Sequence, residues 1–247
     1  MKGSPALKAA VLAQLQRDIL PLQGLKLPSN KDVLNISWGR VAQSFPHGCF
    51  PLGAVHEFLS ASAETKAATG GFLSCILAAL MKNKGACIWI SACRQLFPAA
   101  LAAFGIDPAC ILFIDLKQEK QVPWAVEEAL KCAGLAAVVG EMAEPHFTAT
   151  RRFQLAVEQS RVTGFLIRSS SEKTLASACL SRWKIESIPS TTEDDMPGVG
   201  FPRWNVELLK MRNGIPGKWQ MEWSFGELQV INEQHEQVYE EQERKTG

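Results

Sequence analysis

The stretch that decides the fold runs from residue 52 to residue 92 and reads LGAVHEFLSASAETKAATGGFLSCILAALMKNKGACIWISA. Residues 54–59 and 86–90 are short apolar runs, which are typical of buried strands. Between them, apolar residues recur at spacings of three and four over residues 72–80, which indicates one face of a helix. This order predicts a βαβ unit, in which a phosphate-binding loop would occupy residues 60–69.

The sequence of that loop departs from a phosphate-binding loop, which reads glycine, four residues, glycine, lysine, then serine or threonine. Ser60 and Thr65 stand at the two glycine positions, and Ala67 replaces the hydroxyl residue that would hold magnesium. Lys66 is retained, and Glu64 places a negative charge nearby. We therefore expect a degenerate nucleotide loop with no cofactor and no metal, in which Lys66 is a solvated loop lysine. The alternative is that Lys66 still contributes to nucleotide binding.

The composition fits a chain with one large core and argues against several other classes of protein. The chain has 247 residues, of which 47% are hydrophobic, so it can bury one large core. A net charge of +1 argues against binding to nucleic acid through bulk charge. Seven cysteines without a CxxC pair predict reduced cytosolic thiols, and four widely separated histidines predict no metal site.

The sequence predicts neither a secretory signal nor a membrane anchor. Lys2 and Lys8 are followed by polar residues where a signal peptide needs an apolar core. No stretch is apolar for long enough to span a bilayer. We therefore expect a cytoplasmic protein without membrane contacts.

Patterns of strands and helices continue to alternate after the central unit and predict an α/β fold. The expected helices cover residues 95–104, 123–132 and 148–160, and the expected strands cover residues 111–114, 135–140 and 163–167. This spacing predicts a mostly parallel central sheet flanked by helices. Alternation over residues 182–185, 204–211 and 219–223 then predicts antiparallel strands that extend the sheet.

The predicted organisation has three parts. Residues 1–44 form a helical arm and linker, residues 45–231 form the core with its C-terminal strands, and residues 232–247 form a polar tail that we expect to be disordered. Within the arm, an amphipathic helix over residues 5–20 carries Leu7, Val11 and Leu15 on one side. This apolar side is a candidate surface for a partner.

Five segments of the chain resemble one group of proteins. They are PLGAVHEF at residues 51–58, WISACRQLFPAALAAFGID at 89–107, WAVEEALKCAGLAAVVGE at 124–141, TATRRFQLAVEQSRVTGFLIR at 148–168 and RWNVELLKMRNGIPGKWQMEW at 203–223. Through them, residues 45–225 resemble the ATPase core of the RecA recombinase, and most closely the ImuA family of RecA-related accessory proteins in bacterial mutagenesis cassettes. The resemblance implies a RecA-like core. The family of the cell-division inhibitor SulA, which has a similar degenerate design, is an alternative.

The same resemblance implies that the catalytic positions of an active ATPase have been lost. Cys93 stands where the family carries a catalytic glutamate beyond the second core strand, and a thiol cannot act as that general base. Gly140 stands where a magnesium-directed aspartate would end the fourth strand, and Glu141 follows on the other strand face. Phosphoryl transfer depends on positioning and charge neutralisation, so we expect a pseudo-ATPase without enzymatic activity.

Direct binding of single-stranded DNA is left open by the sequence. The resemblance implies DNA-binding loops after the fourth and fifth strands, and both segments are short or carry few basic residues here. Arg151, Arg152 and Arg168 are candidates for a weak DNA contact. The alternative for Arg151 and Arg152 is the solvated face of a helix.

The resemblance implies the function of a non-catalytic adaptor in DNA damage-induced, error-prone translesion synthesis, as part of the SOS response. The implied partners are an ImuB-type protein, which is an inactive relative of the Y-family polymerases, and an error-prone C-family DNA polymerase, with RecA as a further candidate. Two alternatives remain. One is a nucleotide-binding switch or slow ATPase, and the other is a SulA-like inhibitor or regulator of filament assembly.

Overall fold

The computed structural model describes residues 34, 36–143, 145–169, 176–190 and 199–231. The expected N-terminal helix, with Leu7, Val11 and Leu15, lies outside these residues, as does the tail over residues 232–247. Within the described part of the chain, no helix combines the length and the apolar character needed to cross a bilayer.

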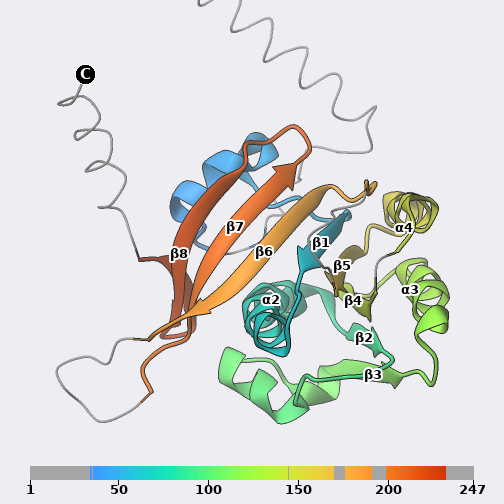
Figure 1. Cartoon of the computed structure of the whole chain (residues 1–247), viewed down its shortest axis with the longest axis horizontal. Helices are drawn as coiled ribbons and strands as arrows, with labels where there is room; N and C mark the ends of the chain where they lie inside the picture. The colour runs from blue at the N-terminus through green and yellow to red at the C-terminus, as the bar shows by residue number, and fades with distance from the viewer. Residues whose placement is uncertain (1–33, 35, 144, 170–175, 191–198, 232–247) are drawn as a thin grey trace, which may run out of the picture.

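One large sheet forms the centre of the molecule (Figure 1). Its strands are β1 (Val55–Leu59), β2 (Cys87–Ser91), β3 (Ile111–Asp115), β4 (Ala137–Met142), β5 (Thr163–Arg168), β6 (Ser181–Ile188), β7 (Arg203–Met211), β8 (Gly217–Ser224) and β9 (Glu227–Val230). They are arranged in the order β3-β2-β4-β5-β1-β6-β7-β8-β9. Neighbours from β3 to β6 pair in parallel, whereas β6 to β9 form an antiparallel meander. The predicted α/β sheet, mostly parallel at its centre and extended by C-terminal antiparallel strands, is confirmed.

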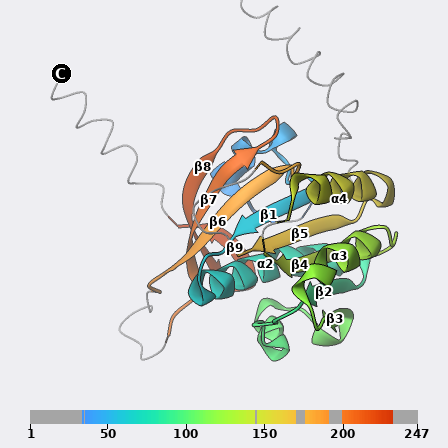
Figure 2. The ribbon, with the colours of Figure 1, turned by 45° about the vertical axis from the view of Figure 1, so that its right-hand side comes forward.

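Helices cover both faces of the parallel part of this sheet (Figure 2). The α-helices are α2 (Ala63–Lys84), α3 (Val122–Leu130) and α4 (Phe147–Ser160), and the 3-10 helices are η1 (Gly39–Ser44), η2 (Pro46–Gly48), η3 (Pro98–Phe104), η4 (Pro108–Cys110) and η5 (Glu119–Gln121). Phe72 of α2 belongs to a core on one face, whereas Val126 of α3 and Phe153 of α4 belong to a core on the other. The sheet is therefore the middle layer between two apolar cores.

Two helices differ from those that the apolar periodicity predicts. α2 begins at Ala63 instead of near residue 72, so most of the expected loop is helical. The expected helix over residues 95–104 is reduced to the 3-10 helix η3, which begins at Pro98. Proline has no backbone N–H and is tolerated at the first turn of a helix, so it defines the start of η3.

The segment just before residue 45, which we expected in the arm, packs with the main core. Val41 is fully buried, and Trp38 is 5% exposed. The ring of Trp38 stacks on Phe50, with the ring centroids 5.4 Å apart. Aromatic pairs of this kind add to the stabilisation from apolar burial alone. Residues 38–50 therefore cover the same face of the sheet as α2.

A buried histidine joins this covering segment to the sheet. His56 of β1 is fully buried, its Nδ1 lies 2.6 Å from Ser181 Oγ, and its Nε2 lies 2.8 Å from the carbonyl oxygen of Pro51. Trp183 Nε1 donates to the same Ser181 Oγ at 2.7 Å. Burial lowers the pKa of His56 from its ordinary 6.5 to about 4, so the ring is neutral near pH 7.

Candidate functional site

The connection between β1 and α2 occupies the place where a nucleotide loop would lie. β1 ends at Leu59 and α2 begins at Ala63, so three residues join them. Ser62 caps the helix: the Thr65 backbone N–H donates to Ser62 Oγ at 3.2 Å, and the Ser62 backbone N–H donates to Thr65 Oγ1 at 2.9 Å. This capping box uses two amide groups that an anion at the start of α2 would otherwise bind.

Ser60 is packed into the interior instead of lining an open loop. Its side chain is fully buried, and its Oγ lies 2.9 Å from Thr69 Oγ1. Its backbone N–H donates to the carbonyl oxygen of Arg168 at 2.8 Å. Neither Ser60 nor Thr65 has a positive φ, so the chain does not adopt the left-handed conformation for which phosphate loops use glycine here.

Lys66 lies on α2 and not in a loop, which corrects the expected position of this residue. The residue is half-buried, so it is not a fully solvated lysine either. It forms no ion pair with any residue that the structure describes. Ala67, the position of the missing hydroxyl, is exposed beside it.

Glu141 of β4 lies on the same side of the sheet as Lys66. Its Oε1 accepts a hydrogen bond of 2.6 Å from Trp89 Nε1 of β2. Burial raises the pKa of the Glu141 carboxyl, while the hydrogen bond from Trp89 and the positive charge of Lys66 act in the opposite direction. The hydrogen bond from Trp89 thus fixes the position of the Glu141 carboxylate.

Gly140 lies on the opposite face of β4, under α3. A Cβ atom added at Gly140 would lie 2.6 Å from Val126 Cγ2, which is closer than the packing tolerates, and 3.0 Å from Met142 Cε, which is a tight contact. An aspartate at this position would therefore point toward α3 and away from Lys66. Cys93, the other position at which the sequence indicates a lost catalytic residue, is exposed after the end of β2 and does not line the cavity described next.

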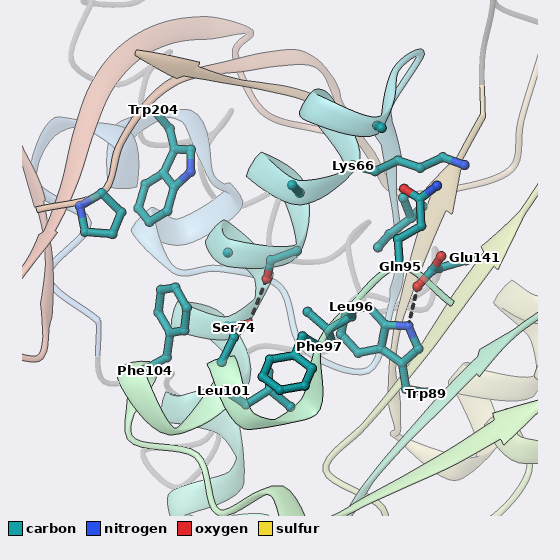
Figure 3. Close-up of a pocket in the computed structure, with 17 residues that line it drawn as sticks. Lys66, Ser74, Trp89, Gln95, Leu96, Phe97, Leu101, Phe104, Glu141 and Trp204 are labelled. Atoms are coloured by element: carbon teal, nitrogen blue, oxygen red, sulfur yellow. Dashed lines mark hydrogen bonds between the residues drawn. The ribbon is translucent and has the colours of Figure 1, made fainter. Parts of the chain in front are cut away.

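A cavity of about 510 Å3 opens beside Lys66, between α2, η3 and the start of β7 (Figure 3). Figure 3 shows Lys66 and Glu141 at one end of this cavity and Phe104 and Trp204 at the other. The lining residues are mostly small or apolar: Ala63, Lys66, Ala67, Gly70, Gly71, Ser74, Trp89, Gln95, Leu96, Phe97, Ala100, Leu101, Phe104, Glu141, Ile167, Pro202 and Trp204. We refer to this space as the α2–η3 cavity.

The sequence alone does not predict the α2–η3 cavity, because its walls come from segments far apart in the chain. One signal was present: Ala63, Ala67, Gly70 and Gly71 recur at helical spacing and form the small-residue side of α2. The partner of that side is Trp204 of β7, whose Cζ2 would lie 3.2 Å from a Cβ added at Gly71. No local pattern indicates that contact.

Arg168 is part of an internal ion cluster, and its expected role as a DNA contact is wrong for this structure. Its side chain is 1% exposed, and its Nη1 lies 2.5 Å from Glu57 Oε2. Glu57 is fully buried and also accepts from Arg182 Nε at 2.7 Å and from Ser177 Oγ at 2.5 Å. The guanidinium of Arg168 compensates a buried carboxylate, so it is not available to a phosphate.

Arg151 and Arg152, the other two DNA candidates, are exposed on α4. Arg152 Nη2 forms an ion pair of 2.7 Å with Glu127 Oε2 of α3. These positions fit the solvated face of a helix, and a DNA contact by them stays a prediction.

Comparisons with known proteins give one clear relationship. No family model matches the chain. Two proteins from two strains of Caulobacter vibrioides, each named Protein ImuA, are 35% identical to this chain over 199 residues. The matched region covers 76% of this chain and 82% of each relative.

Proposed function

The chain belongs to the ImuA family, and on that premise we propose that it acts as a non-catalytic adaptor in DNA damage-induced, error-prone translesion synthesis. Its proposed partners are an ImuB-type inactive relative of the Y-family polymerases and an error-prone C-family polymerase, with RecA as a further candidate. The observation that carries the non-catalytic part is the closed connection between β1 and α2, where Ser62 and Thr65 satisfy each other's backbone amides.

Several features of this connection argue against phosphoryl transfer. Phosphate binding needs free backbone N–H groups in a loop wide enough to surround the anion. The connection here is only three residues long, and the capping box already uses the backbone N–H groups of Ser62 and Thr65. Ala67 has no hydroxyl for magnesium, and Gly140 faces α3. Because phosphoryl transfer depends on positioning and charge neutralisation, these losses together support a protein without ATPase activity.

A nucleotide-binding switch is the second candidate, and one observation favours it. Lys66 and Glu141 line the same cavity, close to the start of α2. A cation and a carboxylate in such a place are the minimum for holding a nucleotide and its magnesium ion. This candidate predicts that Lys66→Ala removes binding.

Isothermal titration of the full chain with Mg-ATP, paired with a turnover assay, tests the choice between these functions. We expect neither heat of binding nor turnover, and an active RecA-type ATPase in the same buffer is the positive control. Binding in the micromolar range that disappears in Lys66→Ala would replace the non-catalytic adaptor with a nucleotide-controlled one.

The adaptor part is tested separately by co-purification of the full chain with the ImuB-type and C-family polymerases. A stable complex with at least one of them is the expected result. Absence of any complex, under conditions in which the two polymerases bind each other, would contradict the adaptor function.

A further inference from the structure

We propose that the α2–η3 cavity receives an aromatic or leucine side chain from an acidic peptide segment of a partner protein, with a carboxylate of that segment at Lys66. This inference rests on the proposed adaptor function and assigns to it a surface and a partner chemistry. It is supported by the size and apolar walls of the cavity, by the hydrogen bonds that Ser74 and Trp89 already form, and by the charge of Lys66.

The size and walls of the cavity suit a large apolar side chain. Its volume of about 510 Å3 lies within the range of about 300–1,000 Å3 that is typical of ligand pockets. On the α2 side, Gly70 and Gly71 have no side chains, so Leu96 and Trp204 pack close to the helix backbone and form apolar walls of the cavity: a Cβ added at Gly70 would lie 3.6 Å from Leu96 Cδ1, and one added at Gly71 would lie 3.2 Å from Trp204 Cζ2. On the other side, Leu101, Phe104 and Trp204 supply apolar contacts.

An exposed aromatic residue adjoins the cavity. Phe97 lines it, yet 69% of this residue is exposed to solvent. Exposed aromatic side chains beside an apolar pocket are typical anchors of protein interfaces, because docking removes their surface from water. A peptide that fills the cavity would cover Phe97 as well.

Two polar side chains of the cavity, Ser74 and Trp89, already form hydrogen bonds within the chain, whereas Gln95 lines the cavity beside Glu141 and forms no side-chain hydrogen bond with the described residues. Ser74 Oγ donates to the carbonyl oxygen of Gly70 at 2.7 Å. Trp89 Nε1 donates to Glu141 at 2.6 Å. A nucleobase or a sugar placed against Ser74 and Trp89 would leave its own donors and acceptors unpaired there, which costs free energy for each such group.

The charge of Lys66 indicates the acidic character of the partner segment. Glu141 lies at the same end of the cavity, where its charge interacts with that of Lys66, and it accepts a hydrogen bond from Trp89 Nε1 at 2.6 Å, while Glu64 Oε1 accepts from Ser187 Oγ at 2.8 Å. Lys66, in contrast, has no ion-pair partner among the residues that the structure describes.

A displayed library of random peptides, selected on the full-length chain, provides the test. We expect enriched peptides to carry Asp or Glu within a few residues of an aromatic residue or leucine. Binding of one enriched peptide is then measured by fluorescence polarisation. Ala67→Trp and Ala100→Arg, both at exposed lining positions, should each weaken it by about tenfold because they fill the cavity.

The charge is tested by a matched pair of lysine variants. Lys66→Met should weaken binding of the peptide by about fivefold, which corresponds to about 1 kcal/mol of binding free energy, and should remove the preference for peptides with Asp and Glu. Lys120→Met, at an exposed position on η5 that does not line the cavity, is the control and should leave binding within about twofold. Thermal unfolding of every variant establishes that it is folded.

Two results would overturn the proposal. One is a selection without enrichment. The other is an enriched peptide that binds wild type, Ala67→Trp and Ala100→Arg equally. Co-purification with the polymerases distinguishes failure of the proposed docking site from failure of the proposed adaptor function. If the polymerases bind wild type and Ala67→Trp equally, the adaptor stands and the cavity is not its docking site.

Discussion

Lowering the pH from about 7.5 to about 4.5 should destabilise the fold through His56. In the folded chain, burial lowers the pKa of His56 to about 4, whereas the unfolded chain keeps the ordinary value of 6.5. Between these two values the unfolded state binds more protons than the folded state. The contribution of His56 to stability is therefore complete above pH 6.5 and is lost as the pH falls toward 4.

The size of this effect follows from the separation of the two pKa values. They differ by about 2.5, and each pKa unit corresponds to about 1.4 kcal/mol, so the whole loss is about 3 kcal/mol. About 1.4 kcal/mol should be lost by pH 5.5 and about 2.6 kcal/mol by pH 4.5. These losses are large compared with the usual stability of about 5–15 kcal/mol.

The assay is urea unfolding of wild type, His56→Gln and His146→Gln at several pH values. His56→Gln should be less stable at pH 7 because it loses the hydrogen-bond geometry of the imidazole to Ser181 and Pro51. On acidification, however, its stability should fall less than that of wild type. His146 is exposed, so His146→Gln should behave as wild type. The reasoning fails if His56→Gln and wild type lose stability in parallel, or if NMR titration of wild type gives His56 a pKa near 6.5.

Three further substitutions test the packing around the candidate site. Gly140→Asp should destabilise the chain by about 3 kcal/mol or more, because its Cβ would overlap Val126, and it should not create magnesium binding in a titration. A stable Gly140→Asp chain that binds magnesium would refute the assigned strand face. Ser62→Ala should lower the urea midpoint by an amount equivalent to about 1 kcal/mol through loss of the helix cap, and an unchanged midpoint would count against the capping box. Glu57→Gln should cost about 3–5 kcal/mol, whereas Glu128→Gln at an exposed ion pair should cost under about 1 kcal/mol; equal costs would contradict the buried cluster.

The strands from β1 to β8 were predictable from the sequence because each is a local pattern, whereas no strand was predicted over β9 (Glu227–Val230). The apolar runs over residues 86–90 and 135–140 correspond to β2 and β4, and the alternating run over residues 219–223 lies within β8. The beginning of α2 was missed because periodicity detects only buried faces, and residues 61–67 are mostly exposed. The signal that marks this beginning is the pair Ser62 and Thr65, which acts through hydrogen bonds to the backbone.

The candidate site was predictable only in part, because its geometry depends on contacts between distant segments. The loss of glycine and hydroxyl residues could be read from the loop itself. The α2–η3 cavity could not be read in this way, since it needs Trp204 to lie across from Gly71. Arg168 was predicted as a DNA contact because it is one of several basic residues in this part of the chain, and its burial could not be predicted because its partner Glu57 lies on β1, far away in the sequence.

The position of β1 in the sheet has a consequence for synthesis on the ribosome. β1 pairs on one side with β5 and on the other with β6, both of which follow it by more than a hundred residues. At about 5–20 residues per second, the nascent chain carries β1 without either neighbour for on the order of ten seconds. During that time the strand has two open edges and the apolar Phe58, a combination that favours aggregation. Nascent chains that end before residue 163 should therefore engage chaperones, and chains that extend beyond β6 should be released from them.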